Sequence, residues 1–127
     1  MIIGTGIDIV EVERIQSSME RYQDRFLGRI FNSSEINYCN TKGNPAIHFA
    51  ARFAAKEAVA KALGTGFSGG IKWTDIEIVS PPNGGKPSVA LHSEAKRTFE
   101  MIGGDHIHLS ITHTALYAVA QAVCEKL

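Results

Sequence analysis

The first apolar segment of the chain gives way to a helical repeat. Residues Met1–Val10 are rich in isoleucine, which favours a short buried strand. From Val12 onward, apolar side chains recur at helical spacing as far as Ile30. This repeat predicts either one helix or two successive helices with a break near Asp24.

Two more helices are predicted in the middle of the chain. Residues 32–35 offer N-cap side chains for a short helix through Tyr38, and the turn-rich residues 40–45 follow it. Residues Ala46–Leu63 are rich in alanine and contain neither glycine nor proline. Because Gly64 comes directly after this run, where a helix often needs a left-handed residue, we expect one long helix to end there.

The second half of the chain predicts two strand pairs and one helix. In order, the expected elements are a strand at Trp73–Val79, a partner strand at Lys86–Leu91, a helix at Ser93–Ile102, and strands at Ile107–Thr112 and Tyr117–Val123. The order of elements predicts an α+β fold, with helices packed on a mostly antiparallel sheet.

Composition narrows the class of protein. A chain of 127 residues with 44% hydrophobic and 20% charged residues is expected to form a single domain over residues 1–127. Thirteen basic and thirteen acidic side chains cancel, which argues against a nucleic-acid or membrane partner. The N-terminus has no basic leader, and Cys39 and Cys124 lack the spacing of a redox or metal pair. We therefore expect a cytoplasmic protein with reduced, buried thiols.

Two carboxylates are candidates for cation binding. Asp8 lies between isoleucines, and an ionised group in so apolar a stretch requires a cation or several hydrogen-bond donors. Glu57 lies on the long helix one turn from Phe53, with Lys61 one turn further on. The alternatives are a helix-capping Asp8 and a surface pair of Glu57 with Lys61. If both carboxylates point inward, the set suits magnesium completed by phosphate oxygens and water.

The glycine-rich segment after the long helix is a weaker candidate. Residues 64–70 offer backbone N–H groups, but they lack the ending of a P-loop and follow a helix C-terminus, whose dipole disfavours anions. A helix cap and turn is the alternative. Phosphate binding there would need positive charge from Lys61 and Arg52.

Histidines and arginines form two more patterns. His106 and His108 share one strand face and suggest zinc, although no third ligand stands at a convincing spacing, and His113 lies at a strand end where ligands often bind. On a helical wheel, four arginines form a basic ridge beside the apolar stripe: Arg14, Arg21, Arg25 and Arg29. Such a ridge is either a solvated face or a docking surface for an acidic partner.

Two segments carry a resemblance to a known family. Residues 6–15 and 52–66 resemble the paired signatures of holo-acyl carrier protein synthase, a 4′-phosphopantetheinyl transferase family, and the resemblance continues through residues 73–78, 85–87 and 110–113. It implies the 4′-phosphopantetheinyl transferase fold. It also implies transfer of the phosphopantetheine arm of coenzyme A to a serine of apo acyl carrier protein, releasing adenosine 3′,5′-bisphosphate.

The resemblance also assigns roles to residues. It implies that Asp8 and Glu57 bind Mg²⁺, and that Arg14 contacts acyl carrier protein, with Arg21 and Arg25 as extensions of that surface. The residues that it implies for coenzyme A are Arg52, Lys61, Gly64, Thr65, Gly66 and His113. A homotrimer is implied, in which the carboxylates and the Arg52 side of one active site come from different subunits.

Some questions stay open at the level of sequence. Lys61 is suited to stabilise the departing phosphate, and the base is either Glu57 or a water held by the metal between the carboxylates, which makes Asp8 a catalytic candidate too. One alternative function is a non-catalytic module that binds carrier protein through the arginine ridge. The other is a zinc-dependent hydrolase that uses His106 and His108.

Overall fold

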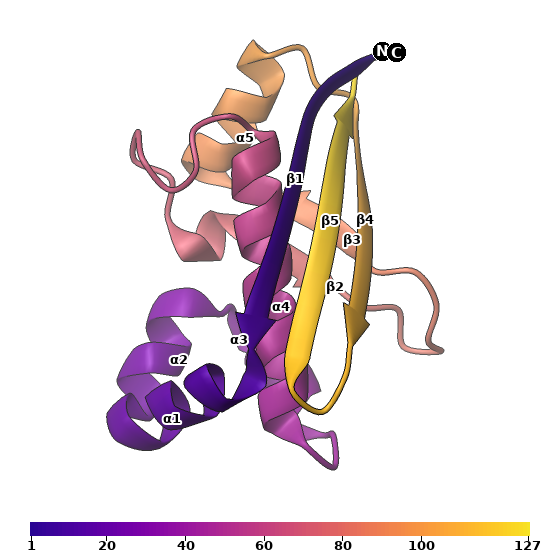
Figure 1. The fold of residues 1–127 in the computed structure, drawn as a ribbon. Coiled ribbons are helices and arrows are strands. Elements are labelled where there is room, and N and C mark those ends of the chain that lie inside the picture. Colours follow the sequence, from indigo (N-terminus) through magenta and orange to yellow (C-terminus); the bar gives the residue numbers. More distant parts are fainter.

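The chain folds into five helices and five strands, with four of the helices following the first strand. The computed structural model describes all residues, 1–127. The elements are β1 (Ile2–Glu11), α1 (Val12–Tyr22), α2 (Asp24–Ile30), α3 (Ser33–Asn40), α4 (Pro45–Ala62), the 3₁₀ turn η1 (Trp73–Asp75), β2 (Ile76–Val79), β3 (Ser88–Leu91), α5 (Ser93–Met101), β4 (His106–His113) and β5 (Tyr117–Glu125). The long helix α4 runs beside β1 and β5, and the other helices lie around it (Figure 1). No helix combines the length and the apolarity that a membrane span requires.

All strands pair in antiparallel fashion, but they form two sheets. One has three strands in the order β1-β5-β4, and the other consists of β2 and β3. In the larger sheet, Ala120 lies between Asp8 of β1 and Ile111 of β4. The prediction of an α+β fold with a mostly antiparallel sheet is therefore confirmed.

Helix α4 packs closely on the larger sheet because small residues line both surfaces. A Cβ atom at Gly4 would collide with the carbonyl oxygen of Ala62, and one at Gly6 with that of Ala58. Alternate alanines of β5 also face the helix and are fully buried. The alternation of strand side chains thus places Asp8, in the same register as Gly4 and Gly6, on the helix-facing side of β1.

The opposite side of β1 is apolar and exposed. Ile7 and Ile9 are each 63% exposed, and Leu116 and Tyr117 at the start of β5 are also exposed. Isoleucines with this much accessible surface form an apolar strip on the sheet face away from α4. Such strips commonly mark protein contacts.

Most element boundaries lie within two residues of the sequence prediction. The first repeat forms two helices, and the predicted break near Asp24 is confirmed, because it falls at Gln23, whose φ is 48°. The segment Trp73–Asp75 is a 3₁₀ turn and not strand, because the Asp75 carboxylate accepts a hydrogen bond from the Lys72 N–H at 3.1 Å. The partner strand begins at Ser88 instead of Lys86, after Pro87, which has no N–H to donate.

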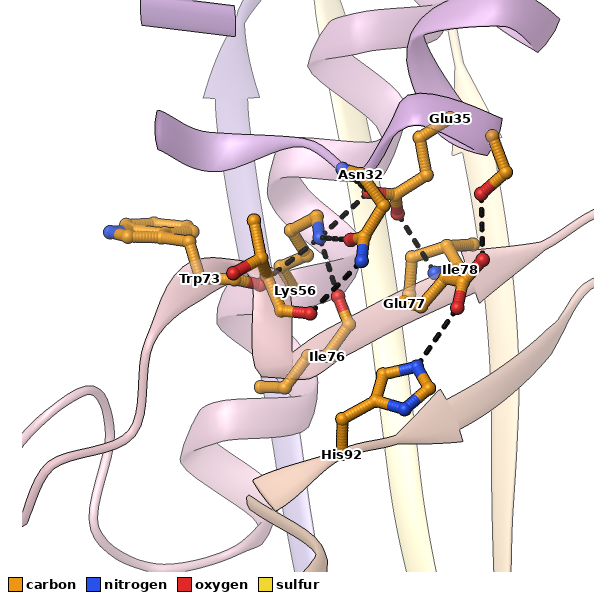
Figure 2. A network of polar contacts seen from close by, with 10 residues as sticks. Asn32, Glu35, Lys56, Trp73, Ile76, Glu77, Ile78 and His92 are labelled. Carbon is orange, nitrogen blue, oxygen red and sulfur yellow. Dashed lines mark hydrogen bonds and ion pairs between the residues drawn. The ribbon is translucent and has the colours of Figure 1, made fainter. Parts of the chain in front are cut away.

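A buried ion pair joins α3, α4 and β2 (Figure 2). The Nζ atom of Lys56 lies 2.9 Å from Oε1 of Glu35, and neither side chain is exposed. Lys56 also donates to the side-chain oxygen of Asn32 at 3.3 Å and to the carbonyl oxygens of Trp73, at 3.1 Å, and Ile76. Its donors are thus fully used inside the protein.

Glu35, the acidic partner of Lys56, also has hydrogen-bond partners inside the protein. Glu35 accepts hydrogen bonds from the N–H of Asn32 at 2.7 Å and from that of Ile78 at 2.8 Å. Burial lowers the pKa of Lys56, and the charge of Glu35 opposes that shift. The network fixes α3 and β2 on α4 at Lys56, one residue before Glu57. Its role is therefore structural.

Candidate active site

Asp8 and Glu57 line one cavity, from β1 and α4 respectively. The cavity has a volume of about 300 Å³. Arg14 of α1 also lines it, as do Phe26 of α2 and Phe53 of α4. The structure therefore brings together both predicted metal ligands and the first arginine of the predicted docking ridge.

Lys61 is the third charged group of the site. Its Nζ atom lies 3.2 Å from Oδ1 of Asp8 and donates to the carbonyl oxygen of Ile7 at 2.9 Å. The Lys61 side chain is 50% exposed, whereas that of Asp8 is 17% exposed. Lys61 thus pairs with Asp8 across the two elements, and the alternative of a surface pair with Glu57 is not among the ion pairs of the chain.

Glu57 is the carboxylate with a perturbed pKa. Burial raises its pKa, the charge of Asp8 raises it further, and Lys61 lowers it. Lys61 pairs with Asp8, and Arg14 pairs with neither carboxylate, so Glu57 has no ion-pair partner in the chain. A cation between the two carboxylates would relieve the repulsion between them. The site is therefore electrostatically incomplete as the chain folds.

The donors of this cavity fit a magnesium ion. Carboxylate oxygens are the ligands that Mg²⁺ prefers, and it commonly keeps only one or two of them while phosphates and water complete the octahedron. No group of three or more histidine, cysteine, aspartate or glutamate side chains gathers at a metal-binding distance in the chain. Zinc at the rings of His106 and His108 would lack a third ligand, and His108 is already bonded to Glu125 at 2.9 Å.

An aromatic stack forms the wall behind Glu57. The ring of Phe53 stacks on Trp73 with centroids 4.8 Å apart, and Phe67 stacks on Trp73 at 3.9 Å. Because Phe67 belongs to the glycine-rich segment, the stack ties that segment to the cavity wall. The backbone of Trp73 is in turn held by a hydrogen bond that the Lys56 ammonium donates to its carbonyl oxygen.

The glycine-rich segment caps α4. The N–H groups of Gly64 and Gly66 donate to the carbonyl oxygens of Lys61 and Ala60, at 3.0 and 3.1 Å. Both glycines have positive φ, at 91° and 59°, as a helix end of this kind requires. These two N–H groups donate within the chain, which agrees with the alternative of a helix cap and turn. Contacts of Gly64, Thr65 and Gly66 with coenzyme A stay a prediction.

Arg52 and His113 lie on another flank of α4. Arg52 is five residues before Glu57, so the two side chains point about 140° apart around the helix. Arg52 is buried, its guanidinium lies 4.0 Å from the ring centroid of Tyr38, and it donates to the hydroxyl of Ser80 at 2.5 Å. The structure thus separates Arg52 from the carboxylates of the same chain, whereas Lys61, also predicted for coenzyme A, lies beside Asp8.

His113 approaches this flank from the end of β4. Its ring lies 5.6 Å from that of His48 on α4, and His48 in turn lies 6.3 Å from the ring of Tyr38. Sequence reasoning did not identify His48 or Tyr38 as site residues. The available signal was the spacing of His48 and Arg52, which are four residues apart and so share one helix face.

The arginine ridge divides between two cavities. Arg14 lines the carboxylate cavity, and Arg25 lines a neighbouring cavity of about 540 Å³ with Arg29 and Trp73. Phe26 borders both cavities. The helix break at Gln23 therefore does not separate the ridge from the site. Arg21 lines neither cavity, and its guanidinium lies 5.7 Å from the ring centroid of the neighbouring Tyr22.

Comparison with known proteins gives matches over nearly the whole chain. Residues 4–120 match the profile of the 4′-phosphopantetheinyl transferase superfamily. A holo-[acyl-carrier-protein] synthase from Koribacter versatilis is 53% identical over 125 residues, which cover 98% of this chain and 99% of that protein.

Solved structures show the same similarity. The holo-[acyl-carrier-protein] synthase from Neisseria meningitidis superposes with a TM-score of 0.89 at 35% identity, covering 99% of this chain and 100% of the other. The synthase from Bacillus anthracis, solved in complex with CoA (3′,5′-ADP), gives a TM-score of 0.81 at 36% identity over 100% of this chain and 99% of the other. The likeness therefore concerns both sequence and three-dimensional arrangement.

Proposed function

Because this chain belongs to the 4′-phosphopantetheinyl transferase superfamily, we propose that it transfers the 4′-phosphopantetheine arm of coenzyme A to a serine hydroxyl of apo acyl carrier protein and releases adenosine 3′,5′-bisphosphate. The chain is an enzyme of the holo-acyl carrier protein synthase group. The observation that carries the proposal is the cavity lined by Asp8 and Glu57, with Lys61 paired to Asp8 and no ion-pair partner for Glu57.

Asp8 and Glu57 would hold one Mg²⁺ in this proposal. When bound, the ion supplies charge neutralisation for the pyrophosphate oxygens of coenzyme A. The two carboxylates extend from a strand and a helix that are packed against each other without a gap, so their positions are set before any ligand arrives. Lys61 would then exchange part of its contact with Asp8 for the departing phosphate.

Glu57 is one candidate to accept the serine proton, and a water held between the two carboxylates is the other. In the free protein, burial and the charge of Asp8 raise the pKa of Glu57, and a cation bound beside it would oppose that shift. Asp8 contributes its negative charge to the site, and its ion pair with Lys61 positions that ammonium group. The aromatic wall of Phe53 and Trp73 limits water on one side of the reacting groups.

Charged side chains without ion-pair partners on the two flanks of α4, Glu57 on one and Arg52 on the other, support a shared active site. In the proposed homotrimer, the carboxylate cavity of one subunit faces Arg52 and His113 of another subunit, and coenzyme A bridges the two. The exposed strip at Ile7 and Ile9 supports this assembly, because an oligomer would remove it from water.

Carrier protein would dock on the ridge that borders the cavity. Arg14 lines the carboxylate cavity itself, and Arg25 lies at the neighbouring cavity next to Phe26. Neither arginine pairs with an acid of its own chain. An acidic partner would therefore find free guanidinium groups beside the reacting centre.

The direct test is a transfer assay read by mass spectrometry. The protein is mixed with apo acyl carrier protein, coenzyme A and Mg²⁺, and the intact mass of the carrier protein is followed. The expected result is addition of the phosphopantetheine arm by the wild type and by a His106→Gln control, with loss of addition on chelation of the metal. Binding of carrier protein without any mass shift, under several divalent metals, would overturn the proposal in favour of a non-catalytic binding module.

A further inference from the structure

A cluster of cation-forming side chains lies on the Arg52 flank of α4. We call it the cation cluster, and its members are Lys42, His48, Arg52 and His113. Tyr38 of α3 lies among them: the Arg52 guanidinium is 4.0 Å and the Lys42 ammonium 4.6 Å from its ring centroid. His48 and His113 continue the cluster towards the end of β4, with ring centroids 5.6 Å apart.

The cation cluster contains no compensating acid. The ion pairs of the chain are formed by other residues, so none of its four members pairs with a carboxylate. The Nε atom of Arg52 is buried and has no hydrogen-bond partner. A buried donor without a partner is costly, and a region of one charge sign favours binding of the opposite charge. Both features fit an anion.

His48 is the member of the cluster whose charge is most sensitive to its surroundings. Burial lowers its pKa, and the neighbouring His113, Lys42 and Arg52 lower it further in that order. These groups come from α4, from the segment before it and from β4, which are the elements around the ring. The nearby Cys39 thiol adds no charge, because burial raises its pKa to about 12. His48 is therefore biased towards the neutral form in the free protein.

We propose that His48 binds a phosphate group of coenzyme A together with Arg52 and His113, and that phosphate binding at this cluster is coupled to uptake of a proton by the imidazole. This inference rests on the proposed function, since it takes the phosphates of coenzyme A as the ligand. It adds a residue outside the segments of family resemblance, and it adds a pH dependence. His48 lies on the same helix face as Arg52, so one anion can contact both.

The direction of the pH effect follows from the charges. A bound phosphate raises the pKa of His48 above its lowered value in the free protein, so between the two values binding takes up a proton. The contribution of His48 to affinity is complete below the pKa of the free form. It is lost as pH rises through the higher pKa of the bound form.

The test compares the wild type with His48→Gln, in which the side chain keeps an N–H donor but cannot become charged. The probe is adenosine 3′,5′-bisphosphate, titrated by calorimetry near pH 6 and near pH 8.5 in buffers of different ionisation enthalpy. We expect the variant to bind about tenfold more weakly than the wild type near pH 6 and within about twofold near pH 8.5. The phosphates of the probe also titrate, but this effect cancels in the comparison of the two proteins.

His106→Gln serves as the matched control, because His106 lies on β4 like His113 but has no place in the cluster. The control should keep the wild-type pH dependence. A ratio of affinities between wild type and His48→Gln that is the same at both pH values, with equal proton uptake, would overturn the inference while the proposed function stands. Absence of probe binding by the wild type would instead count against the proposed function and the inference together, and the transfer assay would then decide the former.

A second measurement does not depend on a variant. Proton NMR of the imidazole C–H signals of the wild type, titrated with pH in the presence and absence of the probe, reports the pKa of His48 directly. We expect that pKa to rise by about one unit or more on binding. An unchanged pKa with saturating probe would contradict the inference.

Discussion

Helix α4 carries two lysines that meet their carboxylate partners in opposite ways. Lys56 is fully buried, pairs with Glu35 at 2.9 Å, and donates to three further oxygen atoms, so its charge is satisfied within the fold. Lys61 is half exposed and pairs with Asp8 at 3.2 Å, while Glu57 in the same cavity is left with a raised pKa. The complete set of partners indicates a structural role for the first pair, and the incomplete set supports the proposal that the second belongs to a binding site.

The same reasoning separates the flanks of α4. In the carboxylate cavity Glu57 has no ion-pair partner, the cation cluster has no acid, and the satisfied network of Lys56 and Glu35 belongs to neither. A ligand that brings a divalent metal to one flank and phosphates to the other would complete both. Because one helix directs these flanks apart, the complementary halves fit a ligand bound between two subunits.

The largest expected effect is the loss of transfer activity when a carboxylate is removed from the cavity. Asp8→Ala or Glu57→Ala should lower the transfer rate by about 1000-fold or more, since each removes charge on which the metal and the reacting phosphate depend. Thermal unfolding should show that the fold persists. A variant that keeps near-wild-type transfer would contradict the assignment of the cavity as the active site.

The second prediction concerns Lys56, whose charge is paired with Glu35 inside the fold. Lys56→Met leaves Glu35 buried without its cation, which should lower the free energy of unfolding by about 3–5 kcal/mol in urea denaturation. The double variant Glu35→Met with Lys56→Met should recover part of this loss, because no unpaired charge then remains buried. A loss below about 1 kcal/mol in the single variant would show that the network is not the structural element we describe.

A smaller effect is expected at the rim of the cavity. Arg14→Glu should lower kcat/KM for acyl carrier protein about tenfold or more, while coenzyme A affinity changes by less than about twofold, because the ridge faces the partner protein. The control is Arg97→Glu on α5, which lies outside both cavities. Equal losses for the carrier protein and for coenzyme A would contradict this division of roles.

The smallest effect concerns stability at the same cavity. Since the pKa of Glu57 in the folded protein is raised above its ordinary value, ionisation of this group costs stability at pH values above the raised pKa. Glu57→Gln should therefore raise the melting temperature by about 1–4 °C near pH 7.5 without metal, and by less near pH 4, where the wild-type group is protonated. A variant that is less stable than the wild type at neutral pH would show that Glu57 contributes to the fold rather than straining it.

The elements of the fold were largely predictable from the sequence. The alanine-rich run and Gly64 predicted α4, which spans Pro45–Ala62, and the helical repeat before it predicted the pair of helices α1 and α2. The prediction that the strand begins at Trp73 was wrong, because a local hydrogen bond from the Lys72 N–H to the Asp75 carboxylate overrides the alternating pattern. Local hydrogen bonds of this kind leave no trace in hydrophobic periodicity.

The site was only partly predictable. Asp8 and Glu57 were identified from burial reasoning and family resemblance, and the structure places both in one cavity. The pairing of Lys56 with Glu35 and the approach of His48 to His113 could not be predicted, because each depends on how distant segments pack. Sequence periodicity assigns a side chain to a face of its own element, but it does not identify the partner on the next element.

The central claim is that Asp8 and Glu57, of which Glu57 has no ion-pair partner in the chain, bind the catalytic metal. The most direct measurement is Mn²⁺ binding followed by electron paramagnetic resonance, with coenzyme A present and Mg²⁺ as competitor. We predict one Mn²⁺ site per chain in the wild type and in a Glu94→Gln control, and an affinity at least about tenfold lower in both Asp8→Asn and Glu57→Gln. Unchanged Mn²⁺ affinity in these two variants would contradict the account.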